Sequence, residues 1–414
     1  ESRIISSCLA DKKKVLLIAG MNAYSKEEEQ LLCSLTEHYQ VAVIAENITN
    51  LNSRPPLSGP EPGPNQKPNI TSPEALNDPA VGPPRTTTEQ EPESNGPEAL
   101  NDPAGNSFIS VPELVLASAG TEELNDLTPN LVVTFGLQVV SKRTRLFVQR
   151  LVNVPVINSG QLPATLFREK ISSTMPGSRK LSKNEHPTTS AQNLSATNHF
   201  LAAWKKQEAT ALQSANTYLS RAGFSNLTAT TAILSQVPPT TTVHLGNSGA
   251  IRYSQLSVPR NDLTYYSNRG TSGIDGSLSA AVGAAMVSPG PHLAVLGDLS
   301  FVYDSNALWN KNFPKNLKII VLNDQGGGIF RLLDGPSRMP FFDEFSVAHH
   351  PVDLQHLAEA FGLKHLFVGD MIGLKTALAT LFSGDTGPAL LEVHTAKSEN
   401  SAIFKQFYKS LQNQ

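Results

Sequence analysis

Short apolar runs that each end in a polar or glycine-rich turn recur along the chain, and this alternation most constrains its fold. The C-terminal half, from about residue 240, contains five such runs: TVHLGN, TYYSN, HLAVLGD, KIIVLND and ALLEVHT. Helix-like stretches such as SLSAAVGAAM, DLQHLAEAFG and LKTALATLF lie between them. Continuous apolar runs of this length are typical of strands buried on both faces of a parallel sheet. The pattern therefore predicts an open α/β sheet with helices on both faces.

The N-terminal half predicts a second sheet of the same kind. KVLLIAG and VAVIAE flank a helical stretch in which Ser25 and Glu28 form a capping box. LVVTFG, a helix-like SKRTRLFVQRL and VPVIN continue the alternation of strand and helix, and a longer helix is expected near Phe200–Ala222. The predicted fold class is therefore α/β, with two doubly wound, mostly parallel sheets.

Two polar stretches interrupt the N-terminal sheet. Residues 51–107 contain 13 prolines and no aromatic residue, and the octamer PEALNDPA occurs twice in them. Such a segment buries too little apolar surface to offset its ordering entropy, so we expect a disordered low-complexity insertion, with a proline-rich docking site as the alternative. Residues from about 168 to 198, rich in Ser, Thr and Asn, are expected to loop out. We predict a Rossmann-like domain at 1–195 and a second domain at 196–414.

Charge and composition exclude several classes of function. Lys and Arg total 33 against 36 Asp and Glu, so no basic excess points to a nucleic acid or an anionic membrane surface. No apolar run approaches the ~20 residues of a membrane span. The two cysteines, Cys8 and Cys33, are too few for a disulfide framework or a thiolate metal site. We expect a cytoplasmic protein without a membrane span or a nucleic-acid partner.

Four polar motifs, GNS, SNRG, GDLS and NDQGGG, directly follow predicted strands, where ligands of such sheets bind. Asp298 ends one strand and Asp324 ends the next, so adjacent strands would bring both carboxylates to the same sheet edge. Two carboxylates beside a glycine-rich turn suit a hard cation such as Mg²⁺, and Ser300 with nearby backbone N–H groups suits a phosphate. Either aspartate alone would be read as a helix N-cap, but their spacing and the three glycines favour the metal.

The GDLS and NDQGGG pair resembles the cofactor signature of thiamine diphosphate-dependent enzymes, in which GD is followed about 25 residues later by N-[ND]. The resemblance implies Mg²⁺ or Mn²⁺ bound by Asp298, Asp324 and the Gly326 carbonyl. Leu299 stands where the family usually has Gly, and Asp324 stands where Asn is commoner. Ile274 resembles the bulky residue beneath the bent cofactor, although alone it would be read as a core residue. The implied thiamine diphosphate contacts are Ile274, Asp298, Leu299, Ser300, Asp324, Gly326 and Gly327.

Four sequence blocks, in this order along the chain, indicate one family among these enzymes: GNSGAIRYSQL, YYSNRGTSGIDGSLSAAVGAA, VLGDLSFVYDSNALW and VLNDQGGGIFRLL. Over residues 244–395 they are similar to the 2-succinyl-5-enolpyruvyl-6-hydroxy-3-cyclohexene-1-carboxylate synthase family of menaquinone biosynthesis. These transferases join 2-oxoglutarate to isochorismate, two dianions that guanidinium forks suit. The implied substrate-binding residues are Asn247, Ser248, Arg252, Arg269, Phe330, Leu333, Lys142 and Arg143.

Each of these substrate-binding assignments has a plainer alternative. Arg252 or Arg269 alone would more often be a surface ion-pair partner, and Lys142–Arg143 an exposed basic pair. Phe330 and Leu333 alone would be read as helix core. His349 and His350 have no identifiable partner and are expected in a loop.

The family has three α/β domains, and the resemblance implies the middle and C-terminal ones only. Its activating glutamate belongs to the N-terminal pyrimidine-binding domain, so no catalytic residue is assigned within this chain. We expect the isolated chain to be inactive, to need that domain in cis or in trans, and to form a homodimer or tetramer. One alternative is another thiamine diphosphate-dependent decarboxylase or synthase with different substrates, although Arg252 and Arg269 argue against a neutral or monoacid substrate. The other alternative is a non-catalytic binding protein derived from the enzyme.

Overall fold

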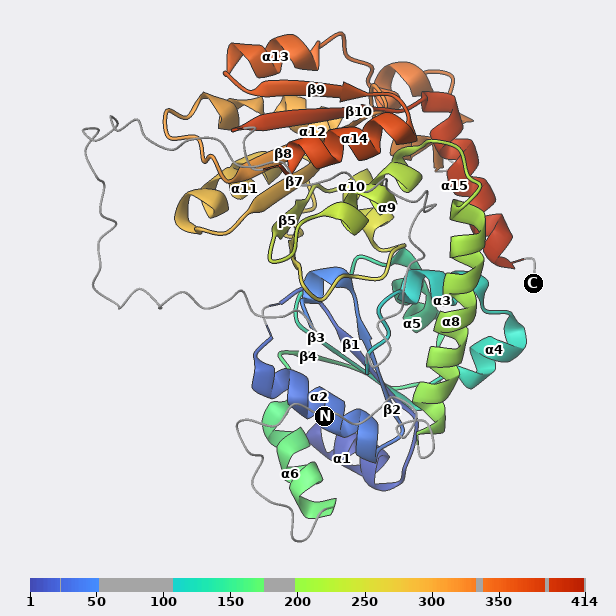
Figure 1. Cartoon of the computed structure of the whole chain (residues 1–414). Coiled ribbons are helices and arrows are strands. Elements are labelled where there is room, and N and C mark those ends of the chain that lie inside the picture. Colours follow the sequence, from blue (N-terminus) through green and yellow to red (C-terminus); the bar gives the residue numbers. More distant parts are fainter. Residues whose placement is uncertain (23, 52–106, 175–197, 333–337, 384–386, 413–414) are drawn as a thin grey trace, which may run out of the picture.

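The computed structural model of the chain describes every residue except 23, 52–106, 175–197, 333–337, 384–386 and 413–414. The described residues form two sheets, one from each half of the chain (Figure 1). Every strand pair in them is parallel, which confirms the predicted α/β class. The predicted insertion at 51–107 lies outside the described residues except at its two ends, and most of the polar loop at 168–198 also lies outside them.

The N-terminal sheet has the strand order β2-β1-β3-β4. Its strands are β1 (Val15–Ala19), β2 (Val41–Ala45), β3 (Leu131–Phe135) and β4 (Val156–Gly160). One face packs against α1 (Ser2–Ala10), α2 (Lys26–His38) and α6 (Ala164–Thr174). The other face packs against α3 (Pro112–Ser118), α4 (Thr121–Asp126), α5 (Lys142–Arg150) and α8 (His199–Leu219).

The C-terminal sheet has the strand order β6-β5-β7-β8-β10-β9. Its strands are β5 (Thr242–Leu245), β6 (Thr264–Tyr266), β7 (His292–Gly297), β8 (Leu317–Asn323), β9 (Lys364–Val368) and β10 (Ala389–His394). One face packs against α9 (Asn226–Gln236), α10 (Gly249–Ser254) and α14 (Met371–Leu381). The other face packs against α11 (Ser277–Val287), α12 (Asp298–Tyr303), η2 (Ser305–Trp309) and α13 (Leu354–Ala360).

Three short helical segments complete the two layers: η1 (Asn47–Thr49), η3 (Gly328–Leu332) and the π-helical η5 (Phe342–Val347). The C-terminal helix α15 (Lys397–Gln412) lies beside α8, and both run along one side of the two sheets in Figure 1. Phe407 and Leu411 of α15 pack with Leu212 of α8 and Leu114 of α3 in one buried apolar cluster. This cluster joins the two halves of the chain.

The carboxyl end of the N-terminal sheet meets the β6 edge of the C-terminal sheet. Asn50, just after η1, pairs with the backbone of Tyr265: its Nδ2 donates to the carbonyl at 2.9 Å, and its Oδ1 accepts from the N–H at 2.7 Å. Asn47 Nδ2 donates to Ser254 Oγ at 2.9 Å. These amide contacts fix the first half of the chain against the β6 side of the C-terminal sheet.

Two details of the sequence prediction are wrong. The strand β9 was not predicted, because Lys364, His365 and Phe367 give it a mixed pattern typical of an edge strand. Residues 168–174, expected to begin a polar loop, belong to the helix α6. The apolar residues Leu166, Phe167 and Ile171 of α6 pack on the N-terminal core, and this packing outweighs the weak helix propensity of the following Ser and Thr residues.

Candidate functional site

Asp298 and the loop after β8 are joined at the carboxyl ends of two adjacent strands. Asp298 follows β7 as the first residue of α12, and only 2% of it is exposed. Its Oδ2 accepts a hydrogen bond from the Gly326 N–H at 2.7 Å, and its Oδ1 accepts one from the Leu299 N–H at 2.8 Å. The carboxylate is therefore held by two backbone donors, one from each of the two strand ends.

Asp324 is the second buried carboxylate at this edge. It directly follows β8, is 8% exposed, and its Oδ2 lies 3.3 Å from Nδ2 of Asn226. Burial, and then the negative charge of Asp298, raise the pKa of Asp324 to about 7. The two aspartates are thus close enough to repel each other when both are ionised.

The glycines of the NDQGGG motif are required by the shape of this loop. Gln325 has φ +56° and Gly326 has φ +140°, so the chain turns back sharply after Asp324. A Cβ on Gly326 would lie 2.5 Å from the Val347 carbonyl oxygen, and one on Gly328 would lie 2.1 Å from Oδ2 of Asp324. The glycines therefore let the backbone approach the carboxylates closely.

The structure brings Ser300 and Ile274 together on the same side of the sheet. The Ser300 hydroxyl donates to the Ile274 carbonyl, which fixes the SGIDG loop over the start of α12. Ser300 is buried, while Ile274 and Leu299 are half-buried. The Gly327 N–H donates to the Val347 carbonyl, so the end of η5 packs on the NDQGGG loop.

The GNS and SNRG motifs converge through Asn247. This side chain is 2% exposed, donates to the carbonyls of Asn268 and Gly273 at 2.6 and 2.7 Å, and accepts from Arg269 at 2.8 Å. Both groups of its amide are therefore engaged with protein atoms, and Asn247 organises the two loops. Ser248 has φ +71°, and its carbonyl accepts from the Arg252 guanidinium at 2.6 Å.

The guanidinium groups of Arg252 and Arg269 belong to one group of interacting charges. Burial, followed by the charge of Arg145, lowers the pKa of Arg252. Burial, followed by the charge of Arg252, lowers the pKa of Arg269. Arg269 is 9% exposed, and among the described residues its Nε has no hydrogen-bond partner. A cluster of like charges of this kind favours an anionic ligand.

Lys142, Arg143 and Arg145, the basic residues at the start of α5, have different surroundings. Arg143 Nε lies 3.5 Å from a carboxylate oxygen of Glu113, and its guanidinium lies 4.9 Å above the ring of Tyr408. Lys142 is exposed. Arg145, which the sequence did not single out, is the α5 residue whose charge acts on both Arg252 and Arg269.

Glu46, at the end of β2, supports this arginine cluster from the N-terminal sheet. Its carboxylate is 2% exposed and accepts from the backbone N–H groups of Val140 and Ser141 at 2.7 and 2.8 Å. Burial raises its pKa to about 7, although these two hydrogen bonds and the Arg269 charge oppose the rise. Glu46 therefore accepts from the two residues that precede α5, and the charge of Arg269 acts on its carboxylate.

Sequence reasoning missed several residues at the site because their partners are distant along the chain. His350 Nε2 lies 3.2 Å from Oδ2 of Asp298, and His349 Nδ1 lies 2.6 Å from the Gln325 carbonyl. Both lie in the predicted loop, but the expectation that they have no partner is wrong. Asn226 is the third such residue. Phe330 is 40% exposed, whereas Leu333 lies outside the described residues.

The donors at Asp298 and Asp324 fit a hard divalent cation. Asp298 and Asp324 are two buried carboxylates, and burial followed by the Asp298 charge raises the pKa of Asp324; together they offer the oxygen ligands that Mg²⁺ prefers. In the described parts of the chain, no three His, Cys, Asp or Glu side chains gather as a metal site. That finding is compatible with a set of two carboxylates and one backbone carbonyl, with cofactor oxygens completing the shell.

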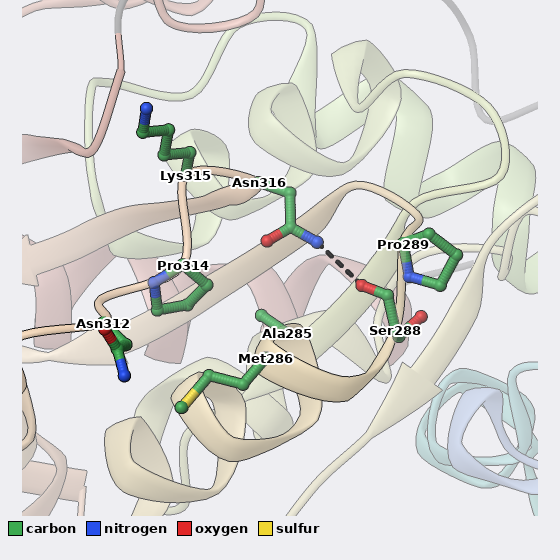
Figure 2. Close-up of a pocket in the computed structure, with 8 residues that line it drawn as sticks. All are labelled: Ala285, Met286, Ser288, Pro289, Asn312, Pro314, Lys315 and Asn316. Atoms are coloured by element: carbon green, nitrogen blue, oxygen red, sulfur yellow. Dashed lines mark hydrogen bonds between the residues drawn. The ribbon is translucent and has the colours of Figure 1, made fainter. Parts of the chain in front are cut away.

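A surface pocket of about 460 Å³ lies at the opposite end of the same strands. Figure 2 shows its lining, formed by Ala285, Met286, Ser288, Pro289, Asn312, Pro314, Lys315 and Asn316. Asn316 Nδ2 donates to the Ser288 carbonyl at 2.9 Å across it. These residues precede β7 and β8, so the pocket is separated from Asp298 and Asp324 by the length of the strands.

No helix in the described ranges is both long and apolar enough to cross a membrane.

Comparison with known proteins identifies the C-terminal half. Residues 246–393 match the family described as thiamine pyrophosphate enzyme, C-terminal TPP binding domain. The matched range contains every motif of the sheet edge described above, from Asn247 to the NDQGGG loop. The resemblance to thiamine diphosphate-dependent enzymes is therefore confirmed.

Curated relatives extend the similarity into the N-terminal half. The chain is 36% identical over 286 residues to a 2-succinyl-5-enolpyruvyl-6-hydroxy-3-cyclohexene-1-carboxylate synthase of Flavobacterium johnsoniae, covering 69% of this chain and 51% of the relative. The Cytophaga hutchinsonii protein of the same name is 32% identical over 290 residues with the same shares. That of Desulfotalea psychrophila is 48% identical over 163 residues, 39% of this chain and 30% of the relative. The chain thus spans about half the length, or less, of these relatives.

Proposed function

We propose that this chain, a relative of the thiamine diphosphate-dependent enzymes that carries their cofactor-binding C-terminal domain, forms the diphosphate- and metal-binding part of a transferase. The reaction we propose follows from the resemblance described in the sequence analysis: decarboxylation of 2-oxoglutarate and addition of the resulting unit to isochorismate, to give the carboxylate for which the relatives are named. The observation that carries this proposal is the hydrogen-bonded junction of Asp298 with the loop after Asp324.

Asp298, Asp324 and the Gly326 carbonyl would hold Mg²⁺ or Mn²⁺, which in turn would neutralise a diphosphate. Ser300 fixes the Ile274 loop, and Leu299 and Gly327 lie beside the two carboxylates in the sequence. When bound, thiamine diphosphate supplies the nucleophile and the electron sink that decarboxylation of a 2-oxo acid needs. The chain's own residues would position this group, and the activating glutamate would come from a pyrimidine-binding domain.

Arg252 and Arg269 would bind the carboxylates of the two dianionic substrates. Each arginine is cationic, and the charges of the neighbouring arginines make a dianion a favourable ligand. We assign Arg145 to this cluster. Arg143 is already engaged by Glu113 and Tyr408, which leaves Lys142 as the freer member of the predicted pair. Ser248 and Phe330 stay in the proposed substrate site, and Asn247 would contribute to it by holding Arg269 and the two loops.

A second copy of the chain is the partner we propose for the α11–η2 surface. Exposed apolar side chains there are Met286 and Val287 of α11, Tyr303 at the end of the intervening α12 and Trp309 of η2, of which Trp309 is 78% exposed. Helix α11 carries no charged residue, which is unusual for a helix with an exposed face. A homodimer or tetramer that buries this surface would remove it from water. We also propose the division into domains at 1–195 and 196–414, and a location in the cytoplasm, where Cys8 and Cys33 would stay free thiols.

Calorimetry with thiamine diphosphate and Mg²⁺ tests the proposed function. We expect metal-dependent binding by the parent chain and none by Asp298→Ala, because the diphosphate would lose its bridging cation. An assay of CO₂ release from 2-oxoglutarate then tests the reaction, with the part of the Flavobacterium johnsoniae relative that this chain does not match added in trans. Cofactor binding without any gain in CO₂ release would favour a non-catalytic binding protein.

A further inference from the structure

A chain of hydrogen bonds between buried side chains ends on the Asp324 carboxylate. Its members come from three segments of the C-terminal half: Asn226 begins α9, Thr395 follows β10, and Asn400 lies in the first turn of α15. They are 5%, 1% and 7% exposed. Buried polar groups of this kind need partners with defined donor and acceptor roles.

The direction of this chain of bonds is fixed by one backbone group. The Asn226 N–H donates to Oδ1 of Asn400 at 2.7 Å, and because a backbone N–H can only donate, it sets the orientation of the Asn400 amide. Nδ2 of Asn400 then donates to the Thr395 hydroxyl at 2.8 Å. The Thr395 hydroxyl, having accepted that bond, donates to Oδ1 of Asn226 at 2.8 Å.

The consequence is that the Asn226 amide presents a donor to Asp324. With its Oδ1 engaged by Thr395, Asn226 directs Nδ2 toward Oδ2 of Asp324 at 3.3 Å. If the amide were reversed, its oxygen would face the carboxylate oxygen, and the two would repel each other. The Thr395 hydroxyl and the Asp324 carboxylate therefore favour the same orientation of the Asn226 amide, and the Asn400 side chain also stabilises the ionised Asp324 carboxylate.

Thr395 also fixes the backbone on which Asp324 stands. Its N–H donates to the Asn323 carbonyl at 3.0 Å. Asn323 in turn donates from Nδ2 to Glu392 at 2.7 Å and accepts at Oδ1 from the Gln325 N–H at 2.9 Å. The residues on both sides of Asp324 are therefore held, and its carboxylate is oriented through Asn226.

We propose that Thr395 is a positioning residue for the metal ligand Asp324: its hydroxyl locks the Asn226 amide in the orientation that holds the Asp324 carboxylate toward Asp298. This inference rests on the proposed function. Groups that orient a metal ligand without touching the metal typically contribute 10- to 100-fold to metal affinity. The role predicted for Thr395 is of that size.

The test is Mn²⁺ binding by the 414-residue chain with thiamine diphosphate, followed by electron paramagnetic resonance. Thr395→Val removes the hydroxyl at nearly the same size and should raise the Mn²⁺ dissociation constant by about 10- to 100-fold. Thr395→Ser keeps the hydroxyl and should restore an affinity close to that of the parent. Asn226→Leu removes the amide altogether, should weaken binding likewise, and decides the question if Thr395→Val does not fold.

A matched control separates positioning from a general loss of packing. Thr36 is also a fully buried threonine, but its hydroxyl donates to the Cys33 carbonyl within α2, far from the site in the N-terminal half. Thr36→Val should leave the Mn²⁺ affinity unchanged even if it lowers the melting temperature. If folded Thr395→Val or Asn226→Leu bound Mn²⁺ as tightly as the parent while Asp298→Ala lost binding, the positioning role of Thr395 would be overturned. The proposed function would stand in that case. No Mn²⁺ binding by the parent chain would instead overturn the proposed function, and this inference with it.

Discussion

The backbone N–H of Gly326 donates to the carboxylate of Asp298 at 2.7 Å, which joins the end of β7 to the loop after β8. This single bond explains why GDLS and NDQGGG, 26 positions apart from Asp298 to Asp324, act as one structural feature. It also brings Asp324 under the influence of the Asp298 charge.

Replacing Gly326 with alanine should disrupt this junction. The added Cβ would meet the Val347 carbonyl oxygen at 2.5 Å, and alanine disfavours φ +140°. We expect a loss of about 1–3 kcal/mol in the free energy of unfolding, together with the loss of metal-dependent cofactor binding. Urea denaturation and calorimetry measure the two effects. Gly369→Ala is the control, because nothing lies within 4 Å of its Cβ position; equal behaviour of the two variants would contradict the account of the loop.

The buried carboxyl of Glu46 should make stability depend on pH. Its pKa is raised to about 7 from an ordinary value of 4.5, so the folded chain binds this proton more tightly than the unfolded chain. This contribution to stability is present below about pH 4.5 and is lost as the pH rises through 7, with a size of about 3 kcal/mol. Glu46→Gln should remove that part of the slope. Urea denaturation from pH 4.5 to 8 measures it, and identical slopes in parent and variant would show that Glu46 titrates normally.

His244 should produce a slope of the opposite sign. Its Nε2 lies 3.0 Å from Nδ1 of His292 in a buried stack, and burial, followed by the His292 charge, lowers the pKa of His244 to about 4. The unfolded chain therefore binds this proton more tightly, and the stability present above pH 6.5 falls by about 3 kcal/mol as the pH drops through 4. In His244→Gln this fall should be absent. The difference in the free energy of unfolding between parent and variant, followed against pH, separates the contribution of His244 from that of Glu46. If this difference did not change with pH, the predicted contribution of His244 would be ruled out.

Removing the Arg145 guanidinium should weaken binding of a dianionic substrate. We expect Arg145→Gln to raise the dissociation constant of 2-oxoglutarate by about 10-fold, the usual size for one charge-assisted contact. Arg150→Gln, on the last turn of the same helix, should leave it unchanged. Calorimetry on the cofactor-loaded chain gives both values. Equal affinities in the two variants would remove Arg145 from the substrate cluster.

The sequence predicted the parts of the fold that are encoded locally. Strands such as Leu317–Asn323 are buried on both faces, so their composition reveals them, and the motifs at their ends follow directly. The edge strand Lys364–Val368 carries no such signal. Asn226, Asn400 and His350 were missed for a different reason. Each acts through a partner at least 52 positions away, and tertiary packing rather than local pattern chooses that partner.

We propose that Asp298 and Asp324 share one metal ion, which would hold the diphosphate of the cofactor. The most direct measurement is a crystal structure of the chain with thiamine diphosphate and Mn²⁺, in which an anomalous difference map locates the manganese. We expect one strong anomalous peak in contact with both carboxylates and with the Gly326 carbonyl oxygen. A bound cofactor whose manganese lies away from either aspartate would contradict it.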